Sequence, residues 1–379
     1  MFPYKKVSFQ FLVALLFLSS LLCLGAQHTQ AAGKQLPPAG KPAQGSCAKL
    51  TVMTRNMYPG TDFADIFAAQ DAPTLLAEVA EAFADVQASD VPARIAAIAH
   101  EIQTTKPDLI SLQEVALWRT GPFDPQTPAT AVAYDYLELL LAELAKHNLE
   151  YEPVAVLTNL EAEAPALGPS GLFDVSFTDR LVVLIRTDLK KKHEFELGEV
   201  EARHFSTLLT VPTPTLGPIT ILRGYIAADV ARCGETFRFV TSHLESFEEF
   251  LGLPFPFFRF AQATELLQGP AATRAPVVLA GDFNADAESP TDPTYQLLLS
   301  AGFIDAWEVI HPNEPGYTWP LFLQSPFEYV IPYQRLDLVL TRGTLEAAKA
   351  KVVGERDVTS LWPMPSDHAG LVVDLRLLP

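Results

Sequence analysis

The segment VVLAGDFNAD, residues 277–286, joins four apolar residues to a Gly, two Asp and an Asn. The apolar part has the composition of a buried strand, and the polar residues follow where such a strand would end. Because side chains two apart in a strand point the same way, Asp282 and Asn284 are expected to share one face while Phe283 packs behind them. A carboxylate beside an amide donor suits activation of a water molecule next to a phosphoryl oxygen. A simple turn is the alternative interpretation, since Gly, Asp and Asn are common turn residues.

The composition indicates a folded, acidic chain. Of its 379 residues, 49% are hydrophobic and 19% are charged, which suits one large domain or two small ones. The formal net charge is −18, so the chain as a whole lacks the basic surface typical of tight nucleic-acid binders. This charge remains compatible with an enzyme that meets phosphate through metal ions.

The N-terminal residues 1–31 have the layout of a secretory signal peptide. Lys5 and Lys6 precede an apolar run, and the small residues Thr29 and Ala31 favour cleavage after Ala31. The sequence therefore predicts an exported protein, secreted or periplasmic. An uncleaved membrane anchor is the alternative, although the apolar run is short for a span.

The rest of the chain is predicted to contain one linker and one domain. Residues 32–47 are rich in Pro, Gly and Gln and predict a flexible linker, whereas residues 48–379 show no composition shift that would divide them. Cys47 and Cys233 remain after cleavage, and an oxidising compartment favours a disulfide between them. Two independent free thiols are the alternative.

Hydrophobic periodicity predicts both helices and strands in this domain. Helices are expected at 91–105, 131–148 and 261–269, with one or two short helices within residues 61–88. Strands are expected at 49–58, 108–115, 151–157, 180–187, 219–230, 236–243, 277–280, 336–343 and 368–378. Strands outnumber helices and cluster in pairs, which favours two packed sheets with helices outside.

Polar residues recur in or beside the apolar strands, where an unpaired charge would be costly. Besides Asp282 and Asn284, they are Asn56, Glu114, Asp179, Arg180, Arg223, His243, Asp337, Asp367 and His368. Each one alone is compatible with a helix cap, an ion pair or a turn. The recurrence of the same arrangement instead predicts a common site at the strand ends.

The residue types at these positions favour metal-assisted phosphate chemistry. Glu114, Asn56 and Asp367 offer oxygen ligands, which suit Mg²⁺ or Mn²⁺, with Ca²⁺ as a further alternative. His243 and His368 suit proton transfer and the stabilisation of phosphoryl charge. The sequence contains no HExxH or CxxC zinc motif, no GxSxG elbow and no Walker loop.

The ordered set of motifs resembles the endonuclease/exonuclease/phosphatase superfamily, which includes pancreatic-type deoxyribonucleases and bacterial neutral sphingomyelinases. The matching pieces run from Asn56 to Leu375 and read TRNMY, LISLQEV, TDRLVVLIR, ILRGY, FVTSHLE, VVLAGDFNAD, RLDLVL and SDHAGL. The resemblance implies a four-layer α/β/β/α sandwich, in which two mainly antiparallel sheets pack together between helices. It places the site at one mouth of the two sheets.

The resemblance also implies roles for the acidic and amide residues. Glu114 is expected to hold the catalytic metal with Asn56 beside it, and Asp367 is expected to bind or approach a second ion. Asp282 is expected to orient and deprotonate the attacking water, while Asn284 holds a phosphoryl oxygen.

The basic residues and their partners receive roles in the same way. His368 is expected to contact the phosphate, oriented by Asp337, and His243 is expected to serve the leaving-group side. As in the deoxyribonuclease branch, Asp179 is expected to pair with the histidine and Arg223 to grip phosphate.

The expected function is that of an exported, metal-dependent phosphodiesterase of the nuclease type. Its substrate would be nucleic acid or a phospholipid headgroup, and no segment indicates an obligate protein partner. The alternatives are a sphingomyelinase-like phospholipid phosphodiesterase and a non-catalytic binding module that retains the fold. Aromatic residues in 246–260 and 318–333, together with the 61–88 insertion, depart from a DNA-binding pattern. The aromatic segments suit either contact with a membrane surface or the core beneath long loops.

Overall fold

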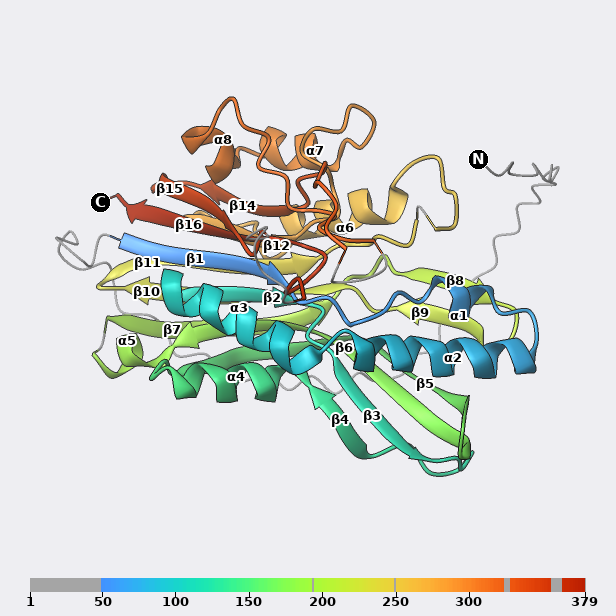
Figure 1. Cartoon of the computed structure of the whole chain (residues 1–379). Helices are drawn as coiled ribbons and strands as arrows, with labels where there is room; N and C mark the ends of the chain where they lie inside the picture. Colours follow the sequence, from blue (N-terminus) through green and yellow to red (C-terminus); the bar gives the residue numbers. More distant parts are fainter. Residues whose placement is uncertain (1–48, 193, 249, 324–327, 356–362, 379) are drawn as a thin grey trace. The chain divides into compact units, whose positions relative to one another are not determined.

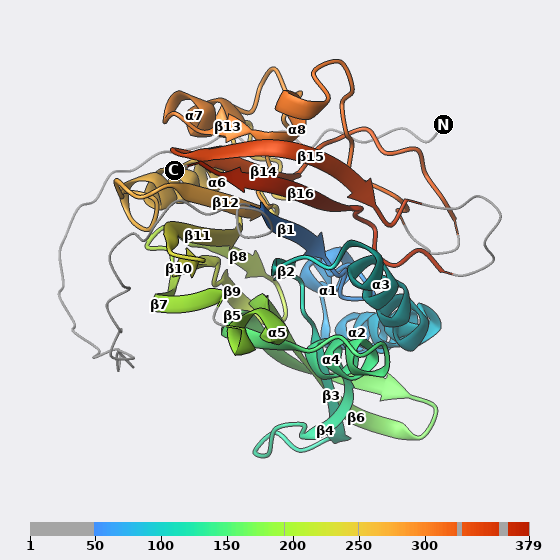
Figure 2. The same cartoon turned by 90° about the vertical axis from the view of Figure 1, so that its left-hand side faces the viewer.

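Two large sheets form the centre of the described chain, and helices cover their outer faces (Figure 1). The computed structural model describes residues 49–378 apart from 193, 249, 324–327 and 356–362. The layers are also visible at right angles to the first view (Figure 2). This arrangement confirms the predicted α/β/β/α sandwich.

The first sheet has eight strands, and most of its neighbours are antiparallel. Its order is β15 (Leu345–Val353), β16 (Gly370–Leu377), β1 (Lys49–Asn56), β2 (Leu109–Gln113), β6 (Gly171–Arg186), β3 (Leu117–Pro122) and β4 (Ala131–Asp135), with β5 (Tyr151–Gly168) also paired to β6. The second sheet has six strands, in the order β13 (Ile304–Asp305), β14 (Asp337–Arg342), β12 (Val277–Asp282), β11 (Glu235–His243), β10 (Gly224–Arg232) and β7 (Phe195–His204). A separate hairpin pairs β8 (Leu209–Thr213) with β9 (Gly217–Ile221).

The helices fall into two groups on opposite sides of the sheets (Figure 1). The group beside the first sheet comprises α1 (Ala64–Ala68), α2 (Ala72–Ala88), α3 (Val91–Thr105) and α4 (Tyr136–Lys146). The group beside the second sheet comprises α6 (Phe257–Gln268), α7 (Thr294–Ser300) and α8 (Ala306–Ile310), while α5 (Thr187–Lys191) follows β6. The helices predicted at 61–88 and 91–105 are therefore confirmed.

Three hydrophobic cores lie between these layers and hold them together. Along β6, Val182 and Leu184 pack toward the helices of the first sheet, whereas Leu181 and Val183 pack toward the second sheet. This alternation is the period of a strand buried on both faces. The third core joins the second sheet to α6 and α7 and contains the fully buried Phe283.

Strand register brings the predicted site residues to one end of both sheets. In the second sheet, His243 lies opposite Asp282, and Asp282 lies opposite Asp337 on its other side. In the first sheet, Asn56 lies opposite Gln113, directly before Glu114. The site ends of β11, β12 and β14 in the second sheet therefore lie beside the ends of β1 and β2 in the first sheet.

Four of the predicted elements were wrong in extent. Residues 131–148 are not one helix, because Ala131–Asp135 form β4 and the Asp135 carboxylate accepts the Leu137 N–H at the start of α4. Such an N-cap fixes where a helix begins. The strands expected at 151–157 and 180–187 belong to a much longer β5–β6 hairpin, whose Ala- and Glu-rich part lacks the usual strand composition. The strand expected at 219–230 is interrupted at Leu222 and Arg223.

The aromatic segment 246–260 is divided between buried and exposed side chains. Phe247 and Phe258 pack against the core beside the first sheet, whereas Phe250, Phe255 and Phe257 are exposed. In the part of the chain that the structure describes, none of the helices has the length and apolar character needed to cross a bilayer. The exposed Phe side chains are compatible with contact with a membrane surface, and that contact stays a prediction.

Several predictions concern residues outside the described part of the chain. The signal peptide at 1–31 and the linker at 32–47 lie there, and so does Cys47. The disulfide between Cys47 and Cys233 consequently stays a prediction. Cys233 itself lies in the turn between β10 and β11.

Candidate active site

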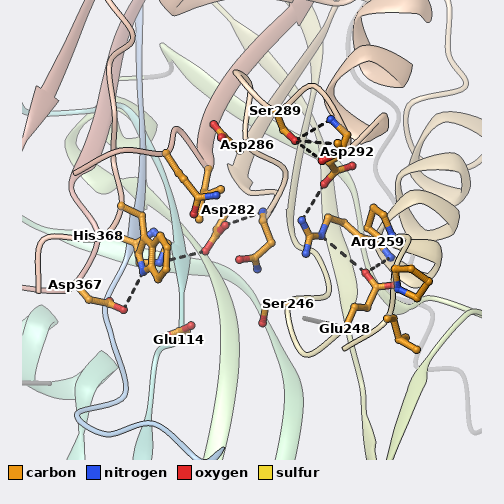
Figure 3. Close-up of a pocket in the computed structure, with 18 residues that line it drawn as sticks. Glu114, Ser246, Glu248, Arg259, Asp282, Asp286, Ser289, Asp292, Asp367 and His368 are labelled. Atoms are coloured by element: carbon orange, nitrogen blue, oxygen red, sulfur yellow. Dashed lines mark hydrogen bonds and ion pairs between the residues drawn. The ribbon is translucent and has the colours of Figure 1, made fainter. Parts of the chain in front are cut away.

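Five of the predicted site residues line a cavity of about 520 Å³ at the ends of the strands (Figure 3). Glu114, Asp282 and His368 line one end of this cavity, together with Asp367. They come from both sheets, since Glu114 follows β2 and Asp282 ends β12. Residues far apart in the sequence thus meet because the two sheets pack with their strand ends together.

Asp282 is the centre of the hydrogen-bond arrangement. Its Oδ2 accepts a hydrogen bond of 3.0 Å from the Asn56 Nδ2, and its Oδ1 accepts one of 2.9 Å from the Asn284 backbone N–H. The Nε2 atoms of His243 and His368 lie 3.5 and 3.7 Å from Oδ2. One buried carboxylate oxygen is therefore flanked by an amide and two imidazoles.

Asn284 reaches the cavity by a turn rather than by continuation of the strand. Strand β12 ends at Asp282, and Asn284 has a φ of 49°, in the left-handed region that Asn tolerates. Its Nδ2 donates a hydrogen bond of 2.9 Å to the Leu244 carbonyl. Both Asp282 and Asn284 line the cavity, while Phe283 packs behind. Asp282 and Asn284 therefore face the same cavity as expected, but a turn places them there and not the alternation of side chains along a strand.

His368 is held between two carboxylates. Its Nδ1 lies 2.8 Å from Asp337 Oδ2, and its Nε2 points toward Asp282. Burial opposes the charge on His368, but Asp337, Asp282 and Asp367 together outweigh burial and raise its pKa to about 10. The imidazole is therefore positively charged at neutral pH, and Asp337 orients it as expected.

His243 has the opposite electrostatic character. Burial lowers its pKa well below the usual value, and the charges of Arg223 and His368 lower the pKa further. Arg223 Nη1 lies 2.6 Å from His243 Nδ1. Because a guanidinium only donates, Nδ1 must accept, which leaves the proton on Nε2 facing Asp282. His243 is thus a neutral donor on that side.

The expected pairing of Asp179 with the histidine is not found. Arg223 occupies the His243 Nδ1 and also donates to the Ser246 hydroxyl at 3.2 Å. Asp179 is buried, and burial raises its pKa, which Arg223 partly offsets. Arg223 therefore contacts the site through His243. This contact forms because the turn before β10 lies beside the end of β11.

Arg180 has a supporting position on the opposite face of β6 from Asp179. Its Nε donates a hydrogen bond of 2.8 Å to the Val115 carbonyl, and its guanidinium pairs with Asp135 at 2.6 Å. Arg180 thereby fixes the backbone directly after Glu114.

Glu114 and Asp367 form a second concentration of negative charge. Glu114 has a φ of 53°, a strained conformation for a residue other than Gly. Burial and the Asp367 charge raise the pKa of Glu114 to about 8. Asp367 accepts hydrogen bonds from Trp319 Nε1 at 3.4 Å and from the Ser366 hydroxyl at 3.3 Å. A carboxyl group whose pKa is raised by burial and by a neighbouring carboxylate is a suitable ligand for a cation.

A further group in the described chain has the geometry of a metal site. Single ligand atoms of Asp282, Asp337 and His368, all buried, lie within 4.8 Å of one another. This group differs from the predicted ligands Glu114, Asn56 and Asp367, and the Asn56 oxygen already accepts the Tyr58 N–H at 3.0 Å. The site as a whole offers mainly carboxylate and amide oxygens, which fit a hard divalent ion.

Sequence reasoning missed the residues at the far end of the cavity. Arg259 lies there and pairs with Asp292 at 2.8 Å, and Glu248 and Ser289 lie nearby (Figure 3). Arg259 stands between two Phe residues at the start of α6, so the sequence indicates only an aromatic segment there. The signal that the sequence offers is a lone arginine within an otherwise apolar stretch.

Arg55 is a second residue that the sequence did not single out. It is buried, pairs with Glu101 of α3 at 2.9 Å, and donates to the His368 backbone carbonyl. The strand-end pattern indicates only the adjacent Asn56. Arg55 instead connects the end of β1 to the loop that carries His368.

Comparison with known proteins agrees with this geometry. Residues 82–368 match the model of the endonuclease/exonuclease/phosphatase family, and the chain belongs to that family. No curated protein sequence matches the chain. Its fold is that of a family of phosphoric ester hydrolases that depend on divalent metals, and the protein is such a phosphoesterase.

Solved structures share the fold at low sequence identity. A family protein from Bacteroides thetaiotaomicron has a TM-score of 0.53 at 17% identity, over 86% of this chain and 97% of that one. One from Leptotrichia buccalis has a TM-score of 0.52 at 15% identity, over 86% and 99%. A mannosyl-6-phosphatase from Bacteroides thetaiotaomicron has a TM-score of 0.51 at 16% identity, also over 86% and 99%.

Proposed function

We propose that the protein is a phosphodiesterase that cleaves its substrate by in-line attack of a water molecule held at Asp282. The observation that carries this proposal is the position of Asp282, whose Oδ2 faces both His243 and His368 beside a cavity large enough for an ester. A general base must lie within reach of the proton that it removes, and the buried carboxylate at the cavity wall meets this requirement.

The residues present fit a divalent ion, and we propose Mg²⁺ or Mn²⁺. Glu114 and Asp367 would hold the ion, with Asn56 beside them. Two observations support this choice, namely the raised pKa of Glu114 and the position of Glu114 and Asp367 on the wall of one cavity. When bound, the ion supplies positive charge that polarises a phosphoryl oxygen.

The two histidines would then act on different sides of the phosphate. The charged His368 would donate to a phosphoryl oxygen and offset the negative charge that grows during attack, while Asp337 keeps its orientation. The neutral His243 would donate its Nε2 proton in a hydrogen bond on the leaving-group side, with Arg223 fixing the tautomer. Asn284 would hold a second phosphoryl oxygen.

A phosphodiester suits this arrangement better than a phosphomonoester. A monoester carries up to two negative charges and demands more cations than a diester. Among the described residues, His368 and Arg223 are the cations beside the reacting centre, Arg223 is already bonded to His243, and Arg259 at the far end of the cavity pairs with Asp292. The substrate would thus be a singly charged ester, either in nucleic acid or in a phospholipid.

Hydrolysis of bis-p-nitrophenyl phosphate tests this function. The purified protein is assayed with Mg²⁺, Mn²⁺, Ca²⁺ or EDTA, alongside Asp282→Asn. Release of p-nitrophenol that requires the metal and is lost in the variant is expected. Equal rates with metal and EDTA, or an undiminished rate in the variant, would refute the proposal. Plasmid DNA and sphingomyelin are the next substrates to compare.

We also propose that the protein is exported, since residues 1–31 have the charge and apolar pattern of a signal peptide. The mature chain would begin at Ala32 and join Cys47 to Cys233. Mass spectrometry of protein from culture medium or periplasm, with and without reduction, tests both statements. An intact Met1 or two titratable thiols would contradict them.

A further inference from the structure

Two apolar cavities adjoin the catalytic centre. The first, of about 410 Å³, has catalytic residues such as Glu114 and His243 on one wall and apolar residues such as Phe247 on another. The second, of about 390 Å³, is lined by Ile66, Val79, Trp118 and other apolar residues. Apolar walls of this kind can remove hydrocarbon from water.

The two cavities meet at a shared apolar neck, which consists of Phe63, Leu160 and Phe177. The ring centroids of Phe63 and Phe177 lie 4.7 Å apart, and those of Trp118 and Phe177 lie 4.6 Å apart. These rings are in contact and form an apolar surface that borders both cavities, whereas the part of the first cavity nearest the reacting centre is also lined by charged residues such as Asp62 and Arg223.

The second cavity lies outside the strand ends that form the site. Helices α1 and α2, the far part of the β5–β6 hairpin and the β8–β9 hairpin supply its walls. Phe63, Ile66 and Ile219 keep part of their surface accessible to solvent, in contrast to the close-packed cores of the sandwich. The charged residues that line this cavity are Glu161 and Glu163, which repel a second phosphate.

We propose that the two cavities together bind a linear alkyl chain of the phosphate ester. This inference rests on the proposed function and specifies its substrate class. A single aromatic ring would fill the first cavity only, whereas an alkyl chain passes the neck and occupies the second. The two glutamates disfavour the polyanionic continuation of a nucleic acid, and the apolar walls favour hydrocarbon.

Binding of alkyl phosphates tests the proposal without requiring turnover. Isothermal titration of the full chain with Mg²⁺ compares ethyl, butyl, hexyl and octyl phosphate, the monoester products that cleavage of alkyl phosphodiesters would leave, each below its micelle-forming concentration. Full burial of each added methylene tightens the dissociation constant by up to about fourfold. A more negative heat-capacity change with length is also expected. Equal affinities along the series would overturn the proposal.

A matched pair of variants on α2 locates the chain. Ala82 lines the second cavity, and Ala84, two residues further on, is exposed. Ala82→Leu should lower the ratio of octyl to ethyl phosphate affinity by about tenfold or more, because the added side chain occupies the space. Ala84→Leu should retain the parent ratio. Equal ratios in two folded variants would place the alkyl chain elsewhere and overturn the assignment of this cavity.

The outcome separates failure of this inference from failure of the proposed function. If bis-p-nitrophenyl phosphate is hydrolysed but alkyl length has no effect on binding, the phosphodiesterase stands and the alkyl site is wrong. If alkyl length governs binding but no metal-dependent hydrolysis occurs, the alkyl site stands and the assigned chemistry is wrong. Should Ala82→Leu not fold, the parent series alone decides.

Discussion

The catalytic mouth and the apolar cavities beside it are built by different means. The mouth consists of polar side chains at the ends of strands from both sheets, held by hydrogen bonds and ion pairs around Asp282. The second cavity consists mainly of apolar side chains from α1, α2 and two hairpins, and the first cavity lies between these segments and the mouth. We infer that the sheets supply the chemistry and that the added segments select the ester.

The largest expected effect is at the centre of the mouth. Asp282→Asn should lower kcat for bis-p-nitrophenyl phosphate by about 10³-fold or more, because the amide cannot accept the proton of the water. Steady-state kinetics measures the effect, and circular dichroism verifies the fold. Asp85→Asn on the exposed side of α2 is the matched control, expected to behave as the parent. A residual rate above a tenth of the parent rate would remove Asp282 from this role.

The two histidines are expected to differ in importance. His368→Gln removes a positively charged donor, whereas His243→Gln replaces one neutral donor by another. Hydrogen bonds from charged groups are roughly twice as strong as neutral ones, so His368→Gln should cost about tenfold more in kcat. Parallel kinetics on the two variants compares them. A larger loss for His243→Gln would indicate that the leaving-group side limits the reaction.

Metal affinity should depend on pH through Glu114. Its pKa of about 8 means that the carboxyl group is mostly protonated at pH 6, and a cation binds the ionised form. The apparent affinity for Mg²⁺ should therefore rise about tenfold per pH unit below pH 8 and level off above it. Titration calorimetry at pH 6, 7, 8 and 9 measures this dependence. Glu114→Gln should both weaken binding and flatten the curve, and a parent curve already flat from pH 6 would argue against Glu114 as a ligand.

The smallest effect is expected on the apolar side. Phe63→Leu loses ring contacts at the neck while keeping it apolar. It should lower the ratio of kcat/KM between octyl and methyl p-nitrophenyl phosphate by a fewfold, with a modest loss of stability. If the ratio is unchanged while both rates fall together, the neck supports the catalytic centre rather than the ester chain.

The strand ends were predictable from sequence because they follow a local rule. An apolar run followed by a polar residue, as at Asn56 or Asp282, identifies both the strand and its exposed end. The family motifs in their order also predicted the layers of the sandwich and the position of the site at one mouth of the sheets. Asp337 and His368 meet as expected, because each borders a strand whose register is fixed by hydrophobic pairing.

The rest could not be predicted because it depends on which segments meet in space. Nothing local to Arg223 or His243 shows that their side chains bond, since that requires the turn before β10 to reach the end of β11. The same holds for the neck, where Phe63 and Phe177 come from segments more than a hundred residues apart. Periodicity includes Phe63 in the helical pattern of residues 61–88 and does not single out Phe177, so neither their contact nor the cavities beside them could be predicted.

The most direct test of the metal centre is an anomalous diffraction experiment on crystals soaked in Mn²⁺. We expect one strong peak within ligand distance of the Glu114 and Asp367 carboxylates, with Asp282 and His368 left free to act on water and phosphate. A peak instead among Asp282, Asp337 and His368, or no peak at saturating Mn²⁺, would contradict the proposed division between metal ligands and catalytic groups.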